Sequence, residues 1–92
     1  MLKVHGECLQ EECAEVIQAV SKIFRFGLNH INPVTNVSNK KQLEEELDQL
    51  SAMITVVRRH YSLGHDQVAY FRKENRHYEW LEKFPQTDTI NE

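Results

Sequence analysis

The sequence predicts an all-α protein with three helices, and three observations lead to this prediction. Apolar residues recur at spacings of three and four over long stretches, which is the period of an amphipathic helix. No stretch shows the regular apolar–polar alternation that is typical of a strand. The 92 residues include only three glycines and two prolines, and apart from Gly6 these residues lie between or after the helical stretches.

The expected helices follow from these stretches and from the residues that end them. The first helix is expected over residues 3–26 and ends at Gly27, since glycine favours the left-handed conformation that follows a helix. Residues 27–38 are rich in asparagine and form a loop that is long for a helix–helix connection. This loop is either a lid or a plain connector. The second helix is expected over residues 39–61 and the third over residues 66–83.

Capping residues support the starts and ends of the last two helices. Ser38 or Asn39 has the side chain of an N-cap for the second helix, and Asp66 has one for the third. Gly64 is expected to close the second helix. Pro85 is expected to end the third helix.

Length and composition indicate one small domain, expected over residues 1–84 and followed by a polar tail over residues 85–92. The net charge of −3 argues against a general nucleic-acid-binding protein.

No apolar run approaches the ~20 residues of a membrane span and no signal peptide opens the chain, so a cytoplasmic protein without a membrane partner is expected. Cys8 and Cys13 fit neither a redox motif nor a zinc knuckle, and both are expected as reduced thiols.

An apolar stripe on each of the first two helices is expected to form the core. The stripes consist of Leu9, Cys13, Val16, Ile17, Val20 and Phe24, and of Leu43, Leu47, Leu50, Ile54 and Val57. In the third helix, Val68 and Phe71 are expected to face inward. On the side of the second helix roughly opposite its apolar stripe lie Glu45, Asp48, Ala52 and Val56. A helix with two such sides is expected to lie between two neighbours. Since a short chain also gains core by association, a homodimer or homotetramer that forms a helical bundle is expected.

Two acidic pairs border these stripes, namely Glu12 with Glu15 and Glu45 with Asp48. A spacing of three places each pair on one face of its helix, where the two like charges repel. A cation between the pairs would remove this repulsion, and carboxylates are the ligands that Mg²⁺ and Mn²⁺ prefer. The alternative is a solvated acidic face, which is the usual role of such pairs. Spacing and composition leave both interpretations open.

In this order and context the residues resemble the MazG-like all-α nucleoside triphosphate pyrophosphohydrolase superfamily, whose members carry ExxE on one helix and ExxD on the next. The segment EECAEVIQAVSKIFRFG, with Lys22 and Arg25, resembles the first helix of small phage and bacterial members. The segment RKENR resembles a basic stretch around an asparagine in the third helix of the family, although its spacing does not decide which basic residue corresponds. The resemblance covers about residues 5–80.

The resemblance implies Mg²⁺-dependent hydrolysis of a (deoxy)nucleoside triphosphate to the monophosphate and pyrophosphate, for nucleotide-pool clean-up or adjustment of a dNTP pool. It implies that the metal ligands and catalytic residues are Glu12, Glu15, Glu45 and Asp48, with Mn²⁺ as an alternative ion and Glu12 as one candidate base. The substrate-binding residues that it implies are Lys22, Arg25, Arg72, Lys73, Asn75 and Arg76. Lys22 and Arg25 could instead complement the end of the first helix. Asn36 and Asn39 are further candidates for contacts to the base and sugar.

Two other classes of protein compete with this interpretation. A non-catalytic helical oligomerisation or adaptor module would carry the acidic face merely as a solvated surface. A di-iron carboxylate bundle is the other alternative, because Glu74 and His77 form an ExxH pair that a homodimer would contain twice. Metal dependence distinguishes the three classes.

Overall fold

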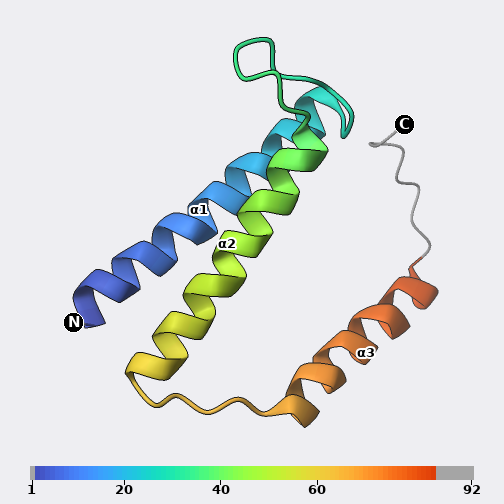
Figure 1. Cartoon of the computed structure of the whole chain (residues 1–92). Helices are drawn as coiled ribbons and strands as arrows, with labels where there is room; N and C mark the ends of the chain where they lie inside the picture. Colours follow the sequence, from blue (N-terminus) through green and yellow to red (C-terminus); the bar gives the residue numbers. More distant parts are fainter. Residues whose placement is uncertain (1, 85–92) are drawn as a thin grey trace.

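The computed structural model describes residues 2–84 and contains α1 (Leu2–Phe26), α2 (Asn39–His60) and α3 (Gln67–Lys83) (Figure 1). The prediction of an all-α protein with three helices is confirmed, and each predicted helix end lies within one residue of the observed end. Within the described residues the β structure amounts to an isolated bridge between Ile31 and Ser38. No helix in this part of the chain is long and apolar enough to cross a lipid bilayer. The tail predicted over residues 85–92 lies outside the described residues.

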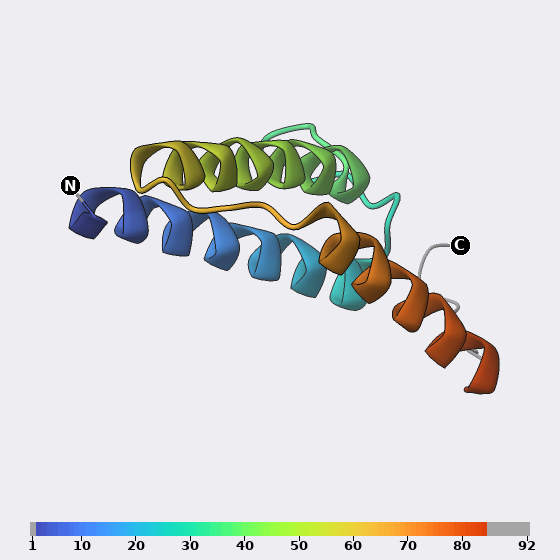
Figure 2. The ribbon, with the colours of Figure 1, turned by 90° about the horizontal axis from the view of Figure 1, so that it is seen from below.

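Helices α1 and α2 form an antiparallel hairpin, and they lie side by side over most of their length (Figures 1 and 2). Its most buried apolar residues are Ala19, Ile23 and Val57. The buried and half-buried positions of α2 follow a spacing of three and four, which is the pattern of a helix packed against one neighbour; they include Leu43, Glu46, Leu50, Met53 and Val57. The acidic residue Glu46 therefore belongs to the packed face of α2.

Several residues of the predicted apolar stripes are exposed, so the prediction that they lie in the core is wrong for the single chain. Ile17 and Phe24 on α1 are each 65% exposed, and Leu47 and Ile54 on α2 are also exposed. The physical reason is the width of the stripes. Each stripe is broader than the surface that a single neighbouring helix covers, so one edge of it stays in solvent.

Asn39 joins the end of α1 to the start of α2. Its side chain is only 3% exposed, and its Nδ2 donates hydrogen bonds to the carbonyl oxygens of Gly27 at 2.9 Å and Lys22 at 3.4 Å. The N-cap of α2 is Ser38, whose Oγ accepts a hydrogen bond from the amide of Lys41 at 3.1 Å. These contacts give Asn39 a structural role, and the idea that it also meets a substrate stays a prediction.

The loop over residues 27–38 is held by its own hydrogen bonds. The carboxamide oxygen of Asn32 accepts from the amide of Val34 at 2.8 Å, and the Asn32 carbonyl accepts from the amide of Asn36 at 2.8 Å. Asn36 takes the left-handed conformation with φ of 60°, which asparagine tolerates better than most residues. These bonds favour the interpretation of this loop as a folded connector rather than a lid.

The residue that follows α2 in the left-handed conformation differs from the prediction. Tyr61 is the C-cap, and Ser62, with φ of 53°, takes the left-handed conformation that was expected at Gly64. The N-cap of α3 is Asp66, whose Oδ1 accepts a hydrogen bond from the amide of Ala69 at 3.0 Å, as predicted.

Helix α3 stands apart from the hairpin. Within the described residues it makes no helix–helix contact with α1 or α2 (Figures 1 and 2). Val68 and Phe71, which were predicted to face inward, are exposed. The prediction is wrong for the single chain because an extended linker carries α3 away from the apolar surfaces of its own hairpin.

We predict that Asn39→Ala destabilises the hairpin by about 1–3 kcal/mol, because it leaves the partly buried Gly27 carbonyl without its donor. Urea unfolding followed by circular dichroism measures this change. Lys40→Ala, at the exposed neighbouring position, is the control and should change the stability by less than about 0.5 kcal/mol. Equal stability of the two variants would contradict the structural role of Asn39.

Candidate metal centre

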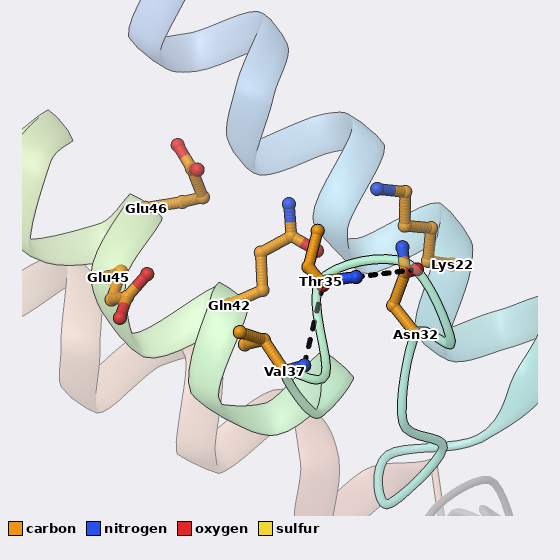
Figure 3. A pocket seen from close by; sticks show the side chains of 7 residues that line it. All are labelled: Lys22, Asn32, Thr35, Val37, Gln42, Glu45 and Glu46. Carbon is orange, nitrogen blue, oxygen red and sulfur yellow. Dashed lines mark hydrogen bonds between the residues drawn. The ribbon is translucent and has the colours of Figure 1, made fainter.

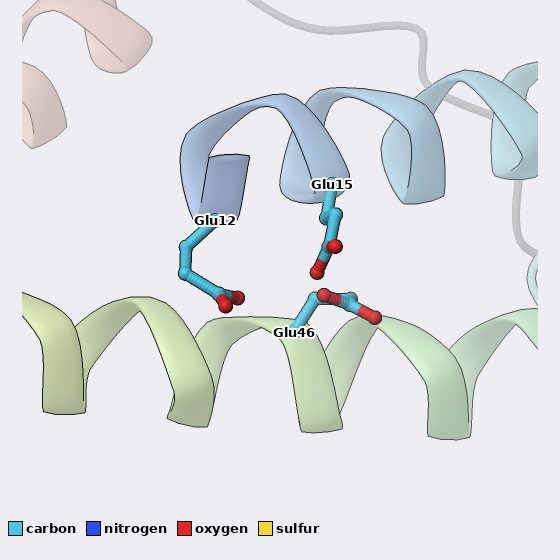
Figure 4. Close-up of side chains that lie close together, drawn as sticks. All are labelled: Glu12, Glu15 and Glu46. Carbon is cyan, nitrogen blue, oxygen red and sulfur yellow. The ribbon is translucent and has the colours of Figure 1, made fainter. Parts of the chain in front are cut away.

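The hairpin brings three carboxylates together. Glu12 and Glu15 come from α1 and Glu46 comes from α2, and each offers an oxygen within 4.8 Å of the others (Figure 4). The spacing of three on α1 places its two carboxylates on one face, and the antiparallel packing brings Glu46 opposite them. Glu12 and Glu46 are half-buried, whereas Glu15 is exposed. We call these three residues the acidic cluster.

Two oxygens of the acidic cluster are buried without a hydrogen-bond partner, namely Oε2 of Glu12 and Oε2 of Glu46. A carboxylate oxygen that loses water without gaining a donor destabilises the folded protein. Two events would relieve this cost. The carboxyl groups can take up protons, or a cation can bind between them.

The pKa values of two cluster residues are raised in the folded protein. Desolvation raises the pKa of Glu12, and the neighbouring carboxyl groups of Glu15 and Glu11 raise it further. A hydrogen bond with the Glu15 carboxyl group raises the pKa of Glu46, and desolvation and the nearby charges of Glu15, Glu12 and Glu45 act in the same direction. The acidic cluster therefore holds negative charge that the fold itself does not neutralise.

A small pocket of about 200 Å³ shares Glu46 with the acidic cluster (Figure 3). Lys22 of α1 lies at one side, and Glu45 and Glu46 of α2 lie at the other (Figure 3). The remaining lining residues come from the loop and the start of α2, and they are Asn32, Thr35, Val37 and Gln42. The pocket thus combines a cation with the carboxylates of α2 next to the acidic cluster.

The second predicted acidic pair lies differently from the first. Glu45 lines the pocket, but Asp48 is exposed and does not belong to the acidic cluster. Two positions along a helix amount to a rotation of about 200°, so Asp48 points nearly opposite to Glu46. The residue three positions after Glu46 is Gln49, an amide, so α2 contributes one carboxylate to the cluster.

Sequence reasoning missed Glu46, although the chain contained a signal for it. Glu46 lies between Leu43 and Leu50 at the spacing of three and four that marks the packed face of α2. The motif ExxD drew attention to Glu45 and Asp48 instead.

The six residues predicted to bind substrate are spread over the molecule. Lys22 lines the pocket, whereas the guanidinium of Arg25 lies over the Phe26 ring, 5.7 Å from its centroid. The other four line shallow hollows on α3, away from the acidic cluster of the same chain, and they are Arg72, Lys73, Asn75 and Arg76. Glu74 and His77 also lie exposed on α3, where the His77 ring stacks on Trp80 at 6.3 Å.

Comparison with known proteins finds no matching family model, no matching curated protein and no matching solved structure. The resemblance to the MazG-like superfamily therefore stays a prediction from the motifs.

We predict that Glu46→Gln stabilises the metal-free protein at about pH 7, and that this gain shrinks toward about pH 5. A carboxyl group with a raised pKa in the folded state binds its proton more tightly there than in the unfolded state. Its ionisation therefore destabilises the fold above the folded-state pKa, and protonation at lower pH removes this effect. Thermal unfolding in EDTA at both pH values measures the difference between wild type and variant.

Glu44→Gln is the matched control for this experiment, because it removes the same charge from an exposed position of α2 outside the acidic cluster. Its effect on the melting temperature should be small at both pH values. If Glu44→Gln and Glu46→Gln gave the same pH-dependent gain, general charge reduction would explain the result and the account of the cluster would be wrong.

Proposed function

We propose that the chain is a Mg²⁺-dependent nucleoside triphosphate pyrophosphohydrolase, which hydrolyses a (deoxy)nucleoside triphosphate to the monophosphate and pyrophosphate. The observation that carries this proposal is the acidic cluster of Glu12, Glu15 and Glu46 beside Lys22. A set of carboxylate oxygens from two helices suits a hard cation, and a lysine next to it suits the phosphates that such a cation accompanies. The reaction itself comes from the family resemblance.

The residues of the acidic cluster fit a bound Mg²⁺. Glu12, Glu15 and Glu46 would hold the ion. The two buried oxygens without hydrogen-bond partners would then coordinate the ion, which would replace the water that they lost on folding. When bound, Mg²⁺ supplies Lewis acidity and lowers the pKa of a coordinated water. Glu12 is one candidate for the carboxylate that accepts the proton of the attacking water.

The proposed reaction transfers the α-phosphoryl group to water. A water oxygen bonds to the α-phosphorus, and the bond from that phosphorus to the α–β bridging oxygen breaks, so that pyrophosphate leaves. Lys22 lies where it can neutralise charge on the leaving phosphates. The pocket of about 200 Å³ is smaller than the ~300–1,000 Å³ of typical ligand sites, and it suits the phosphates rather than a whole nucleotide.

A second copy of the chain would supply the rest of the substrate site. An isolated 17-residue helix is marginal in water, yet α3 exposes Phe71, Tyr78 and Trp80 and contacts neither helix of its own hairpin. The exposed stripe edges of the hairpin, including Ile17 and Leu47, offer apolar surface for α3 of a neighbouring copy. In such a homodimer or homotetramer, basic residues of α3 would approach the acidic hairpin of another copy.

The non-catalytic oligomerisation module remains the second candidate, because the same exposed apolar surfaces support it. It differs in its metal dependence. A solvated acidic face predicts no saturable Mg²⁺ binding and no Mg²⁺-induced rise in melting temperature. The di-iron alternative would require Glu74 and His77 of two α3 helices to come together, and it predicts tight iron binding.

We predict pyrophosphate release from at least one of the eight common NTPs and dNTPs with Mg²⁺ and none with EDTA. Glu15→Gln and Glu46→Gln should each lower turnover by about 100-fold or more, a loss comparable to removing one charge-stabilising group from a catalytic site. Glu44→Gln is the control and should keep the wild-type rate. The absence of both turnover and a metal-induced thermal shift would favour the non-catalytic module.

Asp48→Asn tests which residues of α2 hold the metal. The geometry predicts that this variant retains far more activity than Glu46→Gln, because Asp48 lies outside the acidic cluster. If Asp48→Asn abolished turnover and Glu46→Gln did not, the ligand pair would be Glu45 and Asp48, as the motif alone predicts.

The association proposal predicts that the wild-type chain sediments as a dimer or tetramer and that the double variant Phe71→Ala/Trp80→Ala sediments as a smaller species. The variant should also lose helical circular dichroism signal, because α3 loses the partner that stabilises it. Analytical ultracentrifugation makes the measurement. Glu79→Ala changes an exposed polar residue of α3 and is the control. A monomeric wild type with all three helices formed would contradict this proposal.

A further inference from the structure

The open end of the hairpin, opposite the loop over residues 27–38, carries a second cluster of metal-binding side chains. The antiparallel packing brings the first turn of α1 beside the last turn of α2 (Figure 1). The rings of His5 and His60 meet there with their centroids 4.2 Å apart and their planes tilted by 32°. The Tyr61 ring lies 6.2 Å from each of them. Three side chains with donor atoms thus gather where no loop joins the two helices.

Two of these side chains have a buried polar atom without a partner. Nε2 of His5 and the hydroxyl oxygen of Tyr61 are inaccessible to solvent and make no hydrogen bond. Buried nitrogen and oxygen atoms are nearly always paired in proteins, so a ligand bound between these two residues would give each of them a partner. The acidic cluster plays no part here, because its residues lie about two or more helical turns from His5 along α1, or in the middle part of α2.

We propose that His5, His60 and Tyr61 bind a transition-metal ion of borderline hardness such as Zn²⁺, which holds the first turn of α1 and the last turn of α2 together at the open end of the hairpin. Imidazole nitrogens suit Zn²⁺, Ni²⁺ and Cu²⁺, whereas Mg²⁺ prefers the oxygens of the acidic cluster. A Zn–N bond of ~2.0–2.1 Å places two nitrogens on one ion no more than ~4.2 Å apart. The ring centroids of His5 and His60 lie 4.2 Å apart, so one ion could bind both rings if each turned a nitrogen toward it.

A metal ion bound at this site would stabilise the folded protein. Binding to His5 and His60 ties together residues that are far apart in the chain, and a ligand that binds the folded state alone stabilises it by mass action. The site is independent of the proposed hydrolysis, so its failure would leave the acidic cluster untouched.

The test is a titration of the full chain with Zn²⁺ in the presence of saturating Mg²⁺, followed by calorimetry and thermal unfolding. We expect one equivalent of Zn²⁺ to bind and to raise the melting temperature. His5→Gln and His60→Gln should lose this binding, and Tyr61→Phe should weaken it by about tenfold. His77→Gln removes an imidazole from α3 and should bind Zn²⁺ as the wild type does.

Two results of the titration would overturn the proposal. They are the absence of saturable Zn²⁺ binding and retained binding in His60→Gln. Nuclear magnetic resonance of the wild-type histidine rings gives a readout that needs no folded variant. Zn²⁺ should shift the signals of His5 and His60 and leave those of His77 in place, and the opposite pattern would equally overturn the proposal.

Discussion

The contact between α1 and α2, which organises the described part of the chain, holds three carboxylates that repel one another. Glu12 and Glu46 occupy positions of the packed face that apolar residues would otherwise fill, and each leaves one oxygen buried without a partner. The free-energy cost of burying these oxygens falls in the middle of the only helix–helix contact among the described residues. Such an arrangement is unfavourable for packing alone, and a bound cation would turn the repulsion into attraction.

The remainder of the hairpin keeps this contact in register. Asn39 fixes the start of α2 against the end of α1, and the hydrogen bonds of Asn32 fold the connecting loop beside Lys22. The same loop and the same first turns of α2 line the pocket next to the acidic cluster. Helix α3 contributes nothing to the hairpin of its own chain, so its exposed aromatic residues and basic residues are available to another copy.

Much of the fold could be predicted from the sequence, because helical periodicity and capping residues act locally. The ends of all three helices and the cap at Asp66 belong to this group. The site was harder to predict, since the spacing of three in Glu45 and Asp48 shows which residues share a face but not which face meets α1. Packing geometry selects Glu46 instead. The exposure of Leu47 likewise depends on how the helices meet in space. The left-handed conformation at Ser62 rather than Gly64 accompanies a local hydrogen bond, which the amide of Leu63 donates to the carbonyl of Arg58 at 2.9 Å.

The most direct test of the central claim is to locate Mn²⁺ on the protein by paramagnetic broadening of backbone amide signals. At low Mn²⁺ concentration, we expect broadening to be centred on α1 near Glu12 and Glu15 and on α2 near Glu46, and we expect Mg²⁺ to reverse it. Equal broadening around all exposed acidic residues, or broadening centred on the outer face of α2 near Asp48, would contradict the claim that the carboxylates between α1 and α2 form the metal centre.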